Sequence, residues 1–102
     1  RLAEMNFGAW EMRAWTDIGP AALDAWAADP LHYAPPGGES VSALRQRVLH
    51  FLAELASQRH AAAALVTHAG VMKVISGHAQ NLPPAEWMPL RFAYGGVVQV
   101  TL

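Results

Sequence analysis

The hydrophobic positions of the chain recur with two periods, one typical of helices and one typical of strands. Residues 40–59 carry apolar side chains at helical spacing, with the charged side chains largely off this stripe, which predicts a long amphipathic helix. Ser40 stands at its start and can cap it, because a serine hydroxyl accepts a hydrogen bond from a free N–H of the first turn. The stripe consists of Val41, Leu44, Val48, Phe51, Leu52 and Leu55.

Two other segments have the patterns of β-strands. Residues 62–66 form a short continuous apolar run, which is typical of a buried strand. Residues 97–102 alternate between two faces, one of them more apolar, as a half-buried strand does. Shorter helices are expected at residues 11–15, 21–28, 70–79 and 84–88.

These elements together predict an α/β fold in which helices outnumber strands. A parallel sheet with both faces covered requires more than two strands. The chain also begins with Arg1 rather than with methionine. We therefore expect that one or more strands precede residue 1, and that residues 1–102 form the C-terminal part of a single domain.

The composition limits the kinds of partner. Of the 102 residues, 53% are hydrophobic and 15% charged, so the chain has more apolar surface than a small domain easily buries. A net charge of −1 without a basic run argues against nucleic-acid binding, and no apolar run reaches the length of about 20 residues that a membrane span needs. The absence of cysteine excludes disulfides and thiolate metal sites and leaves the compartment open, with a cytoplasmic location as the default.

The turn at residues 67–70 is the strongest candidate for chemistry. It joins the predicted strand to the following helix and places His68 at the carboxyl end of one and the amino end of the other. Ligands of α/β sheets bind at such places, and the free N–H groups of a first helical turn favour an anion. A histidine there could donate to a phosphate or transfer a proton, but a histidine that merely ends a strand is the alternative.

Other common site motifs are missing from the sequence. The five histidines lack the spacing of a zinc-binding helix with its intervening glutamate. The chain also contains neither a glycine-rich phosphate loop ending in Gly-Lys-Ser or Gly-Lys-Thr nor a GxSxG elbow. We therefore expect neither a metal site nor a cofactor.

Four short motifs follow one another over nearly the whole chain. They are Glu4-Met5-Asn6-Phe7-Gly8, Trp10-Glu11, Pro36-Gly37-Gly38-Glu39-Ser40 and Thr67-His68-Ala69-Gly70. In this order they resemble the histidine phosphatase superfamily with its phosphoglycerate mutase-like fold, and most closely the α-ribazole phosphatase type of cobalamin biosynthesis. The resemblance implies part of a three-layer α/β/α sandwich that lacks its N-terminal strand or strands.

The resemblance also implies roles for individual residues. His68 matches the second active-site histidine, which hydrogen-bonds the transferring phosphoryl group, and the amides of Ala69 and Gly70 match the helix start that holds its oxygens. Glu4 matches the acid that protonates the leaving oxygen and later activates water, with a solvated loop carboxylate as the alternative. Glu11 and the Glu39-Ser40 pair are interpreted as structural supports.

One essential part of that family's pattern is absent. The nucleophilic histidine lies in an Arg-His-Gly segment after the first strand, and no such segment occurs in these 102 residues. The nearest string, at residues 59–61, is at a predicted helix end and is rejected. The second phosphate-binding arginine segment is absent as well. Both are expected upstream of residue 1, so the 102 residues alone are expected to be inactive.

The resemblance leaves three functional hypotheses. The first is a phosphomonoesterase that acts through a phosphohistidine on a small phosphorylated substrate such as α-ribazole 5'-phosphate. The second is a non-catalytic binding module on the same scaffold, for which a homodimer is expected because the strand at residues 62–66 would expose an edge. The third is a phosphoglycerate mutase-type enzyme. Candidates for the rim of the pocket are Trp10, Arg13, Trp15, His32 and Tyr33.

Overall fold

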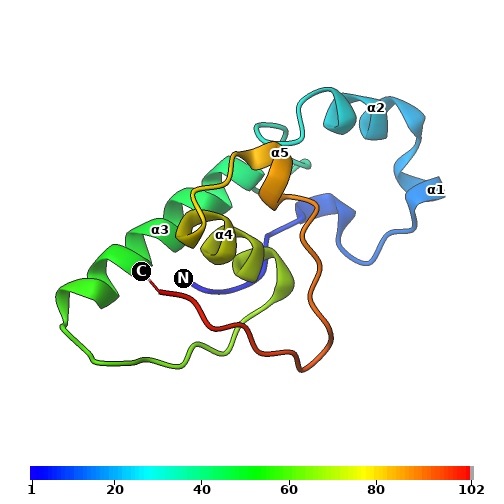
Figure 1. The fold of residues 1–102 in the computed structure, drawn as a ribbon. Coiled ribbons are helices and arrows are strands. Elements are labelled where there is room, and N and C mark those ends of the chain that lie inside the picture. Colours follow the sequence, from blue (N-terminus) through cyan, green and yellow to red (C-terminus); the bar gives the residue numbers. More distant parts are fainter. Residues whose placement is uncertain (102) are drawn as a thin grey trace. The chain divides into compact units, whose positions relative to one another are not determined.

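The computed structural model describes residues 1–101 of the chain. Contacts divide them into two compact units: unit 1 holds residues 1–4 and the chain from residue 45 onward, and unit 2 holds residues 5–44. No helix among the described residues has the length and apolar character to cross a membrane. The elements, shown in Figure 1, are η1 (Gly8–Trp10), α1 (Trp15–Ile18), α2 (Pro20–Ala28), α3 (Val41–Ser57), α4 (Ala69–Ala79) and α5 (Pro84–Trp87).

The predicted α/β fold class, with its partial three-layer sandwich, is wrong: within residues 1–101 the regular structure is entirely helical. Residues 62–66 and 97–101 run as irregular chain (Figure 1), and Leu102 lies outside the described residues. A strand requires a ladder of backbone hydrogen bonds to a neighbour, and the described backbone bonds give these segments none. Their apolar side chains are not buried either, because Val66 is 98% and Val97 94% exposed.

Helix α3 confirms the prediction from the apolar stripe almost to the residue. The Ser40 hydroxyl accepts a hydrogen bond from the Ala43 amide at 3.0 Å, which satisfies one of the free donors of the first turn. Three residues of the stripe, Leu44, Val48 and Leu52, are buried. The helix ends before Arg59, whose φ of 55° is left-handed.

The core of unit 1 comes from three helices. Helices α4 and α5, both predicted from the sequence, pack against each other. Gly77 of α4 makes this packing close, since a Cβ atom on it would lie 2.5 Å from both Cβ and Cγ of Trp87 in α5. The buried apolar side chains of the unit are Val48 and Leu52 from α3, Val71, Val74 and Ile75 from α4, and Trp87 from α5.

Unit 2 is built on two loops that contact each other through their backbones. The Ala9 amide donates to the Pro36 carbonyl at 2.8 Å, and Gly8, with φ of 55°, allows this approach because a Cβ there would lie 2.3 Å from the Pro36 oxygen. Helix α2 confirms the predicted helix at residues 21–28. The helix predicted at residues 11–15 is wrong, because the chain turns at Met12 with φ of 58° and α1 begins only at Trp15.

Candidate functional site

The start of α4 carries the residues of the predicted anion site. His68 occupies the N-cap position with extended backbone, φ −122° and ψ 164°, and Ala69 and Gly70 form the beginning of the first turn. The Met72 amide donates to the His68 carbonyl at 2.9 Å, which closes that turn. The side chain of the N-cap residue His68 makes no capping hydrogen bond, and the positive end of the helix dipole at the start of α4 favours an anionic group there.

The carboxylate of Glu4 lies at this helix start. The Gly70 amide donates to Oε2 of Glu4 at 3.1 Å, which joins two motifs that are 66 residues apart in the sequence. Gly70 makes room for this contact, since a Cβ atom on it would lie 2.2 Å from Oε1 of Glu4. A carboxylate at a helix N-terminus is favourable because it meets both the free N–H groups and the dipole.

The side chain of His68 is exposed beside this contact. Among residues 1–101, no hydrogen bond involves its ring. An imidazole in this position can donate a hydrogen bond to an anion held by the first turn of α4, or accept a proton from it. The structure therefore brings together Glu4, His68, Ala69 and Gly70, the four residues that the sequence singled out.

The backbone that carries Glu4 is tied to unit 1 from two directions. The Thr67 hydroxyl donates to the Leu2 carbonyl at 2.6 Å, from the segment that leads into α4. The guanidinium of Arg47, in α3, donates to the carbonyl oxygens of residues 1, 3 and 4. The sequence interpretation missed Arg47. Its position was the available signal, because an arginine three residues after Leu44 and four before Phe51 lies beside the apolar stripe.

The acidic residues of the other motifs hold a turn in unit 2. The Asn6 amide donates to Oε1 of Glu39 at 2.9 Å, and the Phe7 amide donates to Oε1 of Glu11 at 3.0 Å. Asn6 in turn accepts a hydrogen bond from the Gly8 amide at 2.9 Å. These bonds satisfy successive donors of one irregular loop, as expected of the structural role predicted for Glu11 and Glu39.

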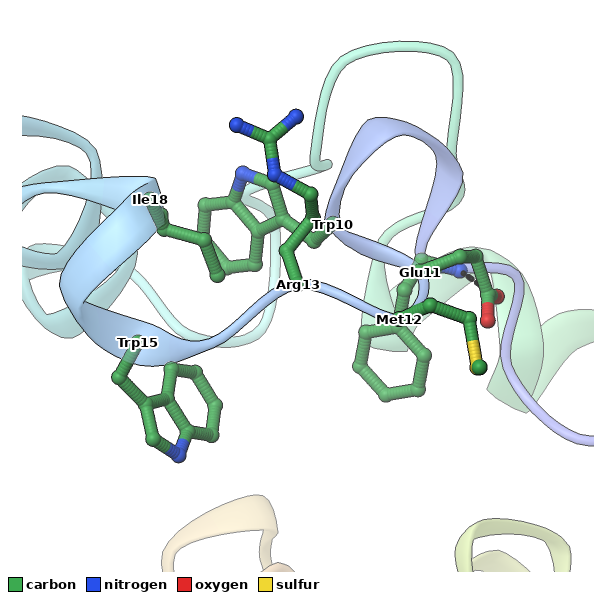
Figure 2. Close-up of a pocket in the computed structure, with 7 residues that line it drawn as sticks. Trp10, Glu11, Met12, Arg13, Trp15 and Ile18 are labelled. Atoms are coloured by element: carbon green, nitrogen blue, oxygen red, sulfur yellow. Dashed lines mark hydrogen bonds between the residues drawn. The ribbon is translucent and has the colours of Figure 1, made fainter.

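Unit 2 also contains a shallow hollow of about 220 Å³ between η1 and α1. Three of the predicted rim residues, Trp10, Arg13 and Trp15, line it. In Figure 2 the side chains of Trp10 and Arg13 lie on one side of the connecting backbone, and Trp15 points to the other. The other two do not line it: the ring of Tyr33 packs against that of Trp10 with centroids 5.5 Å apart, and Nδ1 of His32 lies 3.0 Å from Oδ1 of Asp29.

The described part of the chain holds no group of three or more histidine, aspartate or glutamate side chains placed to bind a metal ion. The charged groups near the start of α4 are instead the carboxylate of Glu4 and, bound to the backbone of the same segment, the guanidinium of Arg47. The chemistry that this arrangement offers is therefore anion binding by amides and imidazole, with a carboxyl group available for proton transfer.

Comparison with known proteins gives consistent matches. Residues 1–102 match the family described as the Histidine phosphatase superfamily (branch 1). The Adenosylcobalamin/alpha-ribazole phosphatase of Escherichia coli is 36% identical over 86 residues, which are 80% of this chain and 42% of that protein. The corresponding protein of Salmonella typhimurium is 31% identical over 98 residues, which are 92% of this chain and 48% of that protein. The chain thus spans about half the length of the curated relatives it matches.

Two solved structures extend the comparison. The crystal structure of the alpha-ribazole phosphatase from Shigella flexneri has a TM-score of 0.77 and 34% identity, over 90% of this chain and 48% of that one. A mycobacterial glucosyl-3-phosphoglycerate phosphatase, solved in complex with inorganic phosphate, has a TM-score of 0.68 and 30% identity, over 88% of this chain and 49% of that one.

Proposed function

The chain belongs to the histidine phosphatase superfamily (branch 1), and from this premise we propose that the intact protein hydrolyses small phosphate monoesters. The observation that carries the proposal is the contact between the Glu4 carboxylate and the Gly70 amide at the start of α4. In this contact a carboxyl group and the start of a helix lie side by side, with His68 at the N-cap position, which supports the proposal. Phosphoryl transfer requires this combination, because the phosphoryl oxygens need donors and the leaving oxygen needs a proton.

The proposed reaction has two steps. A histidine nitrogen attacks phosphorus, the bond from phosphorus to the ester oxygen breaks, and Glu4 gives its proton to the departing alkoxide. Glu4 then takes a proton from water, the resulting hydroxide attacks phosphorus, and the phosphorus–nitrogen bond breaks to release phosphate and free histidine. Forming a covalent intermediate divides one difficult step into two easier ones. The motif that carries the attacking histidine in the resembling family, Arg-His-Gly, does not occur in residues 1–102.

The other site residues bind the group that is transferred. The imidazole of His68 and the amide of Ala69 donate to its non-bridging oxygens, and the Gly70 amide joins them by exchanging Glu4 for the phosphoryl group, where the dipole of α4 favours negative charge. No metal ion takes part in this scheme, since amides and imidazole bind the charge.

The relatives indicate which ester to test first. The curated relatives and one solved neighbour are named for α-ribazole, and another neighbour for a glucosyl phosphoglycerate. We propose α-ribazole 5'-phosphate or a similar small ester as the substrate. Phosphate release from it by the intact gene product, with and without a chelator, is the first test, and we expect turnover that the chelator leaves unchanged.

Variants and trapping of the intermediate distinguish the proposed mechanism from its rivals. His68→Ala should lower kcat/KM strongly, whereas His60→Ala, an exposed histidine at the end of the α3 region, should leave it unchanged. Quenching during turnover with a denaturant at alkaline pH should yield a phosphohistidine that is stable to base and is hydrolysed when acid is added. Phosphate binding without release would support the non-catalytic module instead, and transfer to a second hydroxyl group rather than to water would support a mutase.

A further inference from the structure

The guanidinium of Arg47 donates three hydrogen bonds to backbone carbonyls of residues 1–4, the segment that ends at Glu4. Its Nη1 donates to the Arg1 carbonyl at 2.6 Å, and its Nη2 donates to the carbonyls of Ala3 at 2.8 Å and of Glu4 at 3.2 Å. The arginine side chain is half-buried, and it extends from the first half of α3. One side chain of a 17-residue helix thus binds three of the first four carbonyls of the chain.

We propose that Arg47 is a positioning residue for the general acid, an inference that rests on the proposed function. Its planar guanidinium directs several donors in fixed directions, so it restricts the backbone more than a single flexible donor would. Bonds from a charged donor are also shorter and stronger than those between neutral groups. By holding the carbonyl of Glu4 and that of the residue before it, Arg47 fixes the point from which the carboxyl side chain reaches the Gly70 amide.

Two other side-chain contacts hold the start of this segment in unit 1. Thr67 binds the Leu2 carbonyl on the other side of the segment, and the side chain of Arg1 pairs with Glu54 and lies over the Phe51 ring, with 5.1 Å from its Cζ to the ring centroid. Both contacts are made before residue 3. The bond from Arg47 to the Glu4 carbonyl, in contrast, holds the backbone of the residue that carries the reacting carboxyl group.

If Arg47 acts on catalysis by positioning Glu4, its loss has a kinetic effect that a general loss of protein stability does not have. Protonation by an acid matters greatly for a strongly basic alkoxide leaving group and little for nitrophenolate, which leaves readily as an anion. If Arg47 positions the acid, its loss slows hydrolysis of an alkyl phosphate more than that of p-nitrophenyl phosphate. A variant that is simply less folded slows both equally, so the ratio of the two kcat values in one preparation does not depend on the folded fraction.

The experiment measures this ratio in the intact gene product for wild type, Arg47→Met, Arg47→Lys, Glu4→Gln and the double variant Arg47→Met/Glu4→Gln. Arg45→Met serves as the matched control, because Arg45 is an exposed arginine of the same helix. We expect Arg47→Met to lower the alkyl-to-nitrophenyl ratio by about tenfold to 100-fold, as for an acid displaced by roughly 1 Å, with KM nearly unchanged. Arg47→Lys should give an intermediate ratio, and Arg45→Met the wild-type ratio.

The double variant provides the decisive comparison. Since Arg47 acts through Glu4, Arg47→Met should lower the ratio no further in the Glu4→Gln background. If Arg47→Met and Arg47→Lys both keep the wild-type ratio while Glu4→Gln lowers it, the inference about Arg47 is overturned and the proposed function stands. If Arg47→Met does not fold, the ratio for Arg47→Lys decides in the same way. If the wild-type protein releases no phosphate, both the inference and the proposed function fail.

Discussion

Replacing Gly70 with alanine tests whether the position of the Glu4 carboxylate matters for activity. The added Cβ would lie 2.2 Å from Oε1 and 3.1 Å from Cδ of Glu4. Non-bonded heavy atoms settle about 3.5 Å apart, so the carboxylate must retreat by roughly 1 Å. Glu4 can retreat because the clash is with the far end of a flexible side chain, and Gly70 has no left-handed φ that would exclude alanine.

The effects on stability and on activity should therefore separate. Losing a hydrogen bond to a charged group costs about 1.5–3 kcal/mol, and alanine regains about 1 kcal/mol in a helix. The net loss in the free energy of unfolding is then about 0.5–2 kcal/mol. A displacement of 1 Å in a catalytic group, in contrast, lowers the rate roughly 100-fold.

The assay combines kcat on an alkyl phosphate with urea unfolding of the same intact gene product. His78→Ala, at an exposed position of α4, controls for substitution in this helix and should change neither quantity much. In the Glu4→Gln background, Gly70→Ala should cause little additional loss of kcat, because the group that it displaces no longer donates a proton. A folded Gly70→Ala protein with the wild-type kcat would refute the catalytic relevance of this geometry.

Three further substitutions test the packing, by urea unfolding of the intact gene product. Gly77→Ala should lower the free energy of unfolding by about 1–3 kcal/mol, since its Cβ would overlap Trp87 at 2.5 Å; a change below about 0.5 kcal/mol would contradict the close helix packing. Gly8→Ala should cost about as much, because it combines a left-handed φ with a clash against the Pro36 carbonyl, and an equally stable variant would show that the loops can separate. Ser40→Ala should cost about 1 kcal/mol and Ser40→Asp little, as for an N-cap; equal losses in both would argue against capping.

The helices were predictable because their determinants are local. The stripe and the Ser40 cap lie within one segment, and both recur in the observed α3. The apolar run at residues 62–66 is compatible with a strand, but a strand also needs a neighbouring strand to pair with, and the local sequence does not specify one. Without such pairing among residues 1–101, the segment stays exposed. The homodimer expected from its strand edge remains a prediction.

The site was predictable in part, and for a different reason. A helix start preceded by a histidine indicated an anion site from local sequence alone, whereas no local pattern relates Glu4 to Gly70 across 66 residues. Only the resemblance to a family joined them. The role of Arg47 was not predicted, because hydrogen bonds from a side chain to distant backbone carbonyls produce no periodic pattern in the sequence. Its position beside the apolar stripe of α3 was the available signal.

The most direct test of the central claim is the rate of phosphate release from an alkyl phosphate by Glu4→Gln in the intact gene product. The matched control is Glu11→Gln, the same substitution at a carboxylate that accepts from the Phe7 amide in unit 2. General acid catalysis contributes roughly 10²–10⁴ in rate. The account predicts a loss of that size in kcat for Glu4→Gln and near wild-type turnover for Glu11→Gln, whereas equal turnover by wild type and Glu4→Gln would contradict it.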